Sequence, residues 1–168
     1  MLTLFLVRHA KSSWANPGQA DFDRPLNDRG EKNAPFMGKK LVEKGENPQL
    51  LVSSTAKRAF TTAKYIAKEL GYEKEKIVKR DELYHATVST WLREVSALDS
   101  KHKTVMMFGH NNGITEFANY LCDAGIDNIP TCGIVKVKFD FDDWKMVSKG
   151  AGELVYFDFP KRYKENLE

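Results

Sequence analysis

Short apolar runs alternate with longer amphipathic segments along most of the chain, and this alternation is the feature that most constrains its fold. The runs have the length of strands, and the segments between them repeat apolar residues every three or four positions, as helices do. Buried strands joined by helices form a parallel sheet with helices on both faces. We therefore predict an α/β fold, a three-layer α/β/α sandwich with a mainly parallel sheet, in a single domain over residues 1–168. The predicted strands are 2–7, 50–52, 76–79, 103–108, 134–141 and 154–159, with helices over about 28–44 and 56–70 and from near 88 and 114.

The last two predicted strands have a different pattern from the others. Residues 134–141 (IVKVKFDF) alternate strictly between apolar and polar side chains. Alternation is typical of a strand with one face toward solvent, whereas strands that are buried on both faces are apolar throughout. We therefore expect these two strands near an edge of the sheet.

The first predicted helix has recognisable ends. Asn27 is expected to cap its start, and Gly45 to end it in the left-handed conformation that glycine adopts easily. Pro35 lies inside the helix and lacks the N–H that a helix needs, so a kink or a late start is predicted. The face expected to be buried contains Ala34, Met37, Leu41 and Val42.

Charge and hydropathy argue against several classes of protein. The net charge of +3, without a block of Lys and Arg, argues against a nucleic-acid partner. No apolar run approaches the ~18 residues that span a bilayer, and the apolar start over residues 1–7 is too short for a signal peptide. We therefore expect a cytoplasmic protein without a membrane partner. Cys122 and Cys132 lack metal-ligand spacing and are expected to be reduced thiols, with a disulfide between them as the alternative.

Charged and polar residues follow three of the predicted strands at the point where each strand ends. Arg8 and His9 follow the first strand, Arg58 lies just after the second, and His110 follows the strand over 103–108. Because ligands of such sheets bind beyond the carboxyl ends of the strands, these side chains are expected to converge on one edge. Each of these residues alone is typical of a surface or helix position. Because such residues follow three different strands, together they indicate a functional site.

The chemistry of this cluster favours an anion over a metal ion. His9 and His110 lack a third ligand in an HxH or HxxxH pattern, and flanking arginines would repel a divalent cation. Guanidinium groups instead bind phosphate oxygens through two parallel hydrogen bonds. A helix is predicted to begin near Asn111, so its N–H groups can also face an anion, and Asn111 is counted among the expected phosphate-binding residues. We predict a phosphate site without a metal.

Six segments together resemble one known family. They are LFLVRHAKSSW, DFDRPLNDRG, SSTAKRAFTTA, ELYHA, FGHNNGI and FDFP, and they are spread over nearly the whole chain. The pattern resembles the histidine phosphatase superfamily, also called phosphoglycerate mutase-like. Within it, the chain is similar to the small SixA-type phosphohistidine phosphatases. This resemblance implies a phosphatase of phosphoglycerate mutase-like fold.

The resemblance also implies roles for individual residues. His9 matches the nucleophile that takes the phosphoryl group, and His110 the second histidine of the pocket. Arg8 and Arg58 match the pair of arginines that clamps the phosphate, and Arg24 matches a further phosphate-binding arginine of the smaller members. Neighbouring arginines disfavour a charged His9, so its imidazole is expected to be a neutral nucleophile. Covalent transfer to His9 needs neither a metal nor an organic cofactor.

Glu82 is the candidate for the acid that protonates the leaving group. Superfamily phosphatases commonly place an acid after the third strand, where Glu82 stands, but phosphohistidine-specific members are less regular there. The alternative for Glu82 is a solvated loop carboxylate beside Asp81.

The expected substrate is phosphohistidine on a protein. Only the short segment 80–102 separates the third and fourth predicted strands, so an insertion that could roof the pocket is absent. An open site suits a phosphorylated side chain on a folded protein and disfavours phosphoglycerate mutase activity. A broad phosphatase for small phosphomonoesters is one alternative, and a phosphate- or phosphohistidine-binding module without turnover is another.

Overall fold

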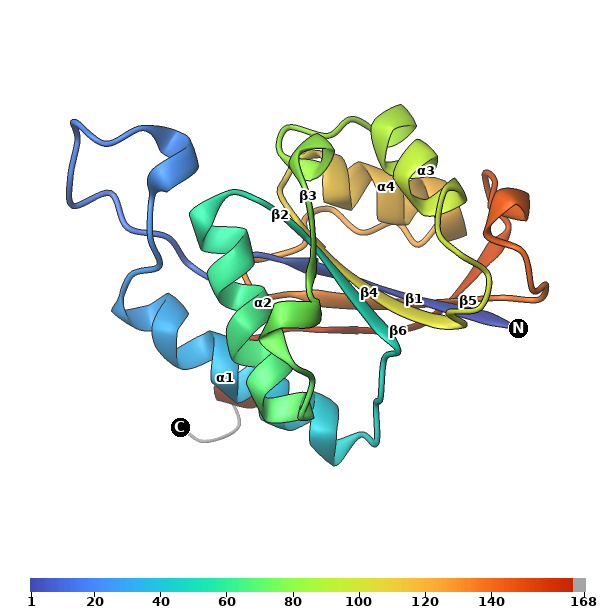
Figure 1. Cartoon of the computed structure of the whole chain (residues 1–168), viewed down its shortest axis with the longest axis horizontal. Helices are drawn as coiled ribbons and strands as arrows, with labels where there is room; N and C mark the ends of the chain where they lie inside the picture. The colour runs from blue at the N-terminus through green and yellow to red at the C-terminus, as the bar shows by residue number, and fades with distance from the viewer. Residues whose placement is uncertain (165–168) are drawn as a thin grey trace.

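A six-stranded sheet forms the centre of the computed structural model, which describes residues 1–164 (Figure 1). The strand order is β3-β2-β4-β1-β5-β6. The strands are β1 (Leu2–Arg8), β2 (Leu50–Ser54), β3 (Val78–Arg80), β4 (Thr104–Gly109), β5 (Ile134–Phe139) and β6 (Gly152–Asp158). The α-helices are α1 (Asp28–Glu43), α2 (Lys57–Leu70), α3 (Val88–Ser96), α4 (Gly113–Cys122) and α5 (Pro160–Lys164). Short 3-10 helices are η1 (Asp21–Asp23), η2 (Lys74–Lys76), η3 (Asp81–Leu83) and η4 (Trp144–Met146).

The sheet is mainly parallel, as the sequence predicts. β3, β2, β4 and β1 run parallel to one another, whereas β5 and β6 are antiparallel to their neighbours and close one side. β6 is an edge strand and β5 lies next to it. The strict alternation in β5 has its expected cause, because Val135 and Val137 are buried while Lys136 and Lys138 are partly exposed.

Helices cover both faces of the sheet, which gives the predicted three layers (Figure 1). In β1, Leu4 and Leu6 pack in the core on the side of α3 and α4, whereas Phe5 and Val7 pack in the core on the side of α1 and α2. Because successive strand residues point to opposite faces, an apolar strand of this kind needs helices packed against both faces of the sheet.

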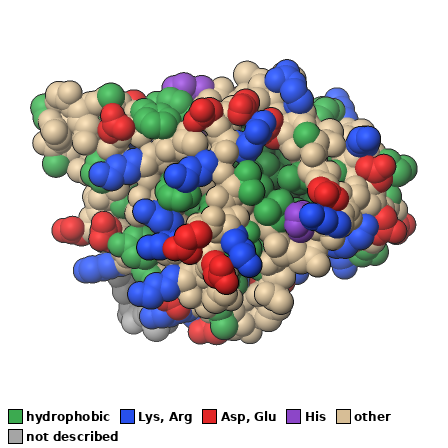
Figure 2. Space-filling model, in the orientation of Figure 1, with side chains coloured by type: hydrophobic (Ala, Val, Ile, Leu, Met, Phe, Trp, Pro, Cys, Tyr) green, Lys and Arg blue, Asp and Glu red, His purple; other side chains and the backbone are tan. Residues whose placement is uncertain are grey.

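The surface charge is mixed on the face seen in Figure 2, where basic and acidic side chains are interspersed.

The ends of α1 follow the prediction, but one detail of it was wrong. The Asn27 side chain accepts a hydrogen bond from the N–H of Gly30 at 2.9 Å, and Gly45 has a left-handed φ of 75°. The prediction for Pro35 was a kink or a late start. The helix starts at Asp28, well before Pro35, so the late start does not occur, and packing of α1 on α2 outweighs the missing N–H. Val42 is 49% exposed, because it lies at the margin of the buried stripe.

The carboxyl ends of β2, β4 and β1 lie side by side, as the sheet order requires. Arg8 and Gly109 are partners in the register of β1 and β4, so His9 and His110, which follow them, leave the sheet side by side. Gly109 must be glycine there, since a Cβ atom would lie 2.4 Å from the Trp91 ring. This edge therefore gathers the polar residues that follow the three strands. Within residues 1–164, no helix has both the length and the apolar character to cross a membrane.

Candidate active site

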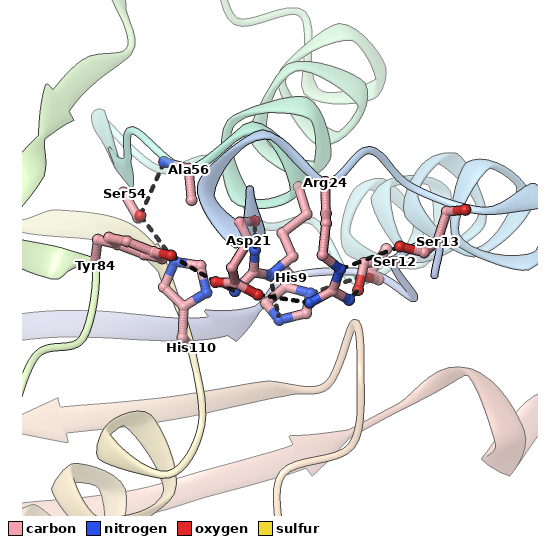
Figure 3. A network of polar contacts seen from close by, with 11 residues as sticks. His9, Ser12, Ser13, Asp21, Arg24, Ser54, Ala56, Tyr84 and His110 are labelled. Carbon is pink, nitrogen blue, oxygen red and sulfur yellow. Dashed lines mark hydrogen bonds and ion pairs between the residues drawn. The ribbon is translucent and has the colours of Figure 1, made fainter. Parts of the chain in front are cut away.

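The two histidines and the arginines that follow the strands line one pocket of about 210 Å³. Figure 3 shows His9 and His110 next to each other at this site. The ring centroids of His9 and His110 are 5.2 Å apart, and Arg58 Nε lies 3.4 Å from His9 Nε2. The side chains that line the pocket are Arg8, His9, Lys11, Ser12, Trp14, Arg24, Arg58, His110, Asn111 and Thr131. Of the predicted site residues, only Glu82 is missing from this set.

His9 presents one ring nitrogen to the pocket in unprotonated form. Its Nδ1 lies 2.7 Å from the carbonyl oxygen of Ala10, which can only accept, so Nδ1 carries the proton. Nε2 is therefore free to accept the hydrogen bond from Arg58. Burial is the main reason that the pKa of His9 is lowered to about 3; the hydrogen bond to Ala10 opposes this shift and the nearby arginines add to it. The imidazole is thus neutral, and nucleophilic, near pH 7.

Two buried nitrogen atoms at the pocket have no hydrogen-bond partner among the described residues. One is Nε of Arg8, whose Nη1 donates to the carbonyl of Ile129 at 2.9 Å, and the other is Nδ1 of His110. A buried polar group without a partner costs about 1–3 kcal/mol. An oxyanion between the two histidines would provide acceptors for such groups, so the pocket fits a phosphoryl group.

Asp21 is a member of the cluster that the sequence did not reveal. Its carboxylate accepts hydrogen bonds from Arg24 at 2.7 Å, Arg58 at 3.0 Å and the hydroxyl of Tyr84 at 2.5 Å (Figure 3). The Tyr84 hydroxyl, helped by the two arginines, holds the pKa of Asp21 far below its usual range, against the effect of burial. Asp21 is therefore an ionised carboxylate that joins the loop of residues 10–26 to α2.

Arg24 is fixed by contacts within that same loop. Its Nε donates to the carbonyl of Ser13 at 3.1 Å, and its Nη2 donates to the hydroxyl of Ser12. The indole of Trp14 stacks on the guanidinium, 3.4 Å from the ring centroid, although Trp14 is 74% exposed. These contacts hold the buried Arg24 side chain in the lining of the pocket, and its role in binding phosphate stays a prediction.

Glu82 and Asn111 have different positions relative to the pocket. Glu82 lies on η3 and pairs with Arg80 at 3.5 Å, while Arg80 in turn binds Glu94 with two hydrogen bonds. The structure therefore does not bring Glu82 to the pocket, and its role as an acid stays a prediction. Asn111 lines the pocket, with its amide bound to the carbonyl of Ile129 and to Thr115.

Comparison with known proteins assigns the family. A model of the histidine phosphatase superfamily (branch 1) matches residues 4–92, more than half of the chain. A chloroplastic protein of Arabidopsis thaliana is 31% identical over 150 residues, which cover 84% of this chain and 68% of the relative. The chain belongs to the histidine phosphatase superfamily. The expected phosphatase family is thereby confirmed.

This histidine phosphatase also matches part of a larger protein. It is 40% identical over 75 residues to the mitochondrial serine/threonine-protein phosphatase Pgam5 of Drosophila melanogaster. The match covers 45% of this chain and 25% of Pgam5, so it spans a quarter of that relative's length.

Solved structures confirm the fold and the resemblance to SixA-type members. SixA of Agrobacterium tumefaciens, assigned as a phosphohistidine phosphatase, is 28% identical with a TM-score of 0.79 over 95% of this chain and 98% of that one. SixA of Nakamurella multipartitia is 25% identical, with a TM-score of 0.80 over 95% and 96%. A SixA complex with tungstate has a TM-score of 0.82 over 96% and 99%; at 19% identity it supports the fold alone.

The remaining polar clusters of this histidine phosphatase do not resemble a metal centre. Over residues 1–164, no group of three or more His, Cys, Asp or Glu side chains is placed to hold a metal ion. Cys122 and Cys132 are both free thiols, so the alternative of a disulfide between them does not hold.

Replacing Glu82 with Gln in this histidine phosphatase is expected to change kcat/KM for an alkyl phosphate by less than about 10-fold, because the carboxylate pairs with Arg80 outside the pocket. The measurement compares an alkyl phosphate with para-nitrophenyl phosphate, whose leaving group departs without a proton. A loss of roughly 10²–10⁴ confined to the alkyl phosphate would instead identify Glu82 as the general acid.

Proposed function

We propose that this histidine phosphatase removes phosphoryl groups from phosphohistidine on proteins through a phosphorylated His9. The proposal extends the family assignment to a substrate and to individual residues. It is supported by the similarity over nearly the full chain to SixA of Agrobacterium tumefaciens, and by the chemistry of the pocket.

The proposed reaction has two displacement steps. In the first, the lone pair on Nε2 of His9 forms a bond to phosphorus while the P–N bond of the substrate breaks, and the leaving imidazole takes up a proton from solvent. In the second, water attacks phosphorus, the P–Nε2 bond breaks, and the proton lost by water balances the one taken up before. Arg8, Arg24 and Arg58 would stabilise the charge on the equatorial oxygens in both steps.

The observation that carries the choice of substrate is the lack of a protonated carboxylic acid at the pocket. Among the described residues that line it, none is Asp or Glu. Asp21 lies next to it but is ionised, since its pKa is held far below its usual range, and Glu82 pairs with Arg80. An alkoxide leaving group needs an acid, whereas the ring nitrogen of phosphohistidine is readily protonated by solvent. Such a pocket favours P–N over alkyl P–O substrates.

The shape of the site supports a substrate presented by a protein. Between the end of β3 at Arg80 and the start of β4 at Thr104, the chain forms only η3, α3 and short connections. Lys11 and Trp14 line the pocket and are themselves exposed, so the mouth lies at the surface. A phosphorylated side chain of a folded partner can therefore reach His9 without the movement of a lid.

The test is a comparison of substrates under identical conditions. A phosphohistidine-bearing phosphotransfer protein should have a kcat/KM about 10²-fold above those of a phosphoserine peptide and a sugar phosphate, which corresponds to about 2.7 kcal/mol in transition-state stabilisation. If a small sugar phosphate or nucleotide proves the better substrate, the chain is a general phosphomonoesterase instead. Failure to turn over any of these compounds would favour the binding module.

One comparison favours a second candidate, a phosphatase for phosphomonoesters of serine or threonine. The segment shared with Pgam5 covers 45% of the chain, and that relative is named a serine/threonine-protein phosphatase. The phosphoserine peptide in the same assay decides between the two. A cytoplasmic location also belongs to this proposal; the plant relative is chloroplastic, so fractionation of cells that express the chain is the appropriate measurement.

A further inference from the structure

We infer that Ser54 is a positioning residue that fixes the proton of His110 on Nδ1, which makes His110 a hydrogen-bond donor to the phosphoryl group. The inference deepens the proposed function, because it assigns a partner for the phosphoryl oxygens in the same pocket. Ser54 is the last residue of β2 and is fully buried, and His110 directly follows β4, the neighbouring strand.

Ser54 has two hydrogen-bond contacts through its hydroxyl oxygen. The oxygen lies 2.8 Å from Nε2 of His110, and it accepts a hydrogen bond from the N–H of Ala56 at 3.2 Å (Figure 3). The second ring nitrogen of His110, Nδ1, is buried without a partner among the described residues. In Figure 3 this nitrogen lies on the side of the ring that faces His9 and Asp21.

Only one arrangement of protons gives the Ser54 hydroxyl both an acceptor and a donor among its described contacts. If Nε2 of His110 carried the proton and donated it to Ser54, the buried Ser54 hydroxyl would find no acceptor among its described contacts. If the Ser54 hydroxyl instead donates to Nε2, Ser54 is satisfied as donor and as acceptor. Nδ1 then carries the proton, because the tautomer of a neutral imidazole is set by the hydrogen bond at its other nitrogen.

The tautomer decides whether His110 attracts or repels an anion. Burial lowers the pKa of His110 to about 2, and His9 and Arg58 add to this shift, so the ring is neutral and holds a single proton. With that proton on Nδ1, the ring donates toward the position between the two histidines. With it on Nε2, the lone pair of Nδ1 would face the phosphoryl oxygens. A neutral donor of this kind is equivalent to one donor of an oxyanion hole.

The neighbouring Ser53 provides a matched control. It is equally buried and lies on the same strand, but its hydroxyl donates to the backbone carbonyl of Ser54 at 2.9 Å. Ser53→Ala therefore removes a buried hydroxyl next to the site while the hydroxyl of Ser54 stays in place.

The experiment measures the tautomer directly by ¹⁵N–¹H correlation NMR of the histidine rings in the full chain. We expect the wild type and Ser53→Ala to show His110 protonated on Nδ1, and Ser54→Ala to show it on Nε2. Ser54→Ala should lose about 10²-fold in kcat/KM for para-nitrophenyl phosphate, as for loss of one oxyanion donor, and Ser54→Thr should recover most of this loss.

A wild-type His110 that is protonated on Nε2 would overturn the inference, and so would a Ser54→Ala variant that keeps Nδ1 protonated. Because the wild-type spectrum needs no variant, the test stands even where Ser54→Ala does not fold. The spectrum also needs no turnover, so failure of the phosphohistidine assay with Nδ1 protonated would reject the proposed substrate and leave the role of Ser54 intact.

Discussion

Replacing His9 with Ala is expected to abolish the phosphoenzyme and turnover together, with a loss on the order of 10⁴–10⁶ in kcat. The reason is that Nε2 of His9 is the unprotonated imidazole nitrogen at the pocket that Arg58 contacts, and alanine offers no atom to accept the phosphoryl group. Rapid quenching in alkali, followed by mass spectrometry, should detect a phosphoramidate on the wild type that is lost on acid treatment. The same protocol should detect none on His9→Ala.

A histidine far from the pocket serves as the control for this experiment. His102 lies just before the start of β4, whereas His110 directly follows the other end of this strand. His102→Ala should retain the adduct and most of the activity. A His9→Ala variant that keeps more than a few per cent of the wild-type rate would show that another group takes the phosphoryl group.

The second large effect is expected at Arg58. Arg58→Ala should lose about 10²–10³ in kcat/KM, because in the proposed mechanism the guanidinium stabilises charge that develops on the phosphoryl oxygens. This arginine is also bonded to His9 Nε2 and to both the carboxylate and the carbonyl of Asp21, so its removal disturbs three groups of the pocket. Inhibition by vanadate, an oxyanion, should weaken in parallel. Steady-state kinetics with para-nitrophenyl phosphate provide the measurement.

Lys57 offers a matched control for the charge at Arg58. It precedes Arg58 in α2 but is exposed, whereas Arg58 is buried. Lys57→Ala removes one positive charge from the same turn and should change kcat/KM by less than about threefold, since solvent screens exposed charges. Equal losses for the two variants would attribute the effect of Arg58 to general electrostatic attraction and contradict its assignment to the phosphate clamp.

The convergence of Arg8, His9, Arg58 and His110 could be predicted from the sequence for a geometric reason. In a parallel sheet, the carboxyl ends of neighbouring strands lie at one edge, so residues that directly follow apolar runs are brought together whatever the details of the loops. The structure places all four around one pocket. The α/β/α layers were predictable on similar grounds, because apolar strands and the apolar stripes of helices indicate which faces of these elements must be buried against one another.

The remaining parts of the site depend on contacts that periodicity does not encode. Asp21 lies three residues before Arg24, a spacing that suggests a local ion pair, but its bond to Arg58 joins segments 37 residues apart. Tyr84 reaches Asp21 from a different loop again. Glu82 was predicted as the acid of the site from its position after β3, but in the structure it lies on η3 and its side chain pairs with Arg80. Loop geometry of this kind is fixed only by the folded chain.

Asp21 lowers the positive charge around the pocket, because its carboxylate pairs with Arg24 and Arg58. Arg8, Arg24 and Arg58 contribute three positive charges and Asp21 one negative charge, while His9 and His110 are neutral, which leaves a net charge of +2 before Lys11 is counted. The exposed Lys11 adds little, because solvent screens it. A phosphoryl group, which loses its second proton near pH 6, balances this charge as a dianion. A sulfate ester carries a single negative charge and leaves one arginine uncompensated. The valence of the anion is thus a basis for discrimination, separate from its shape.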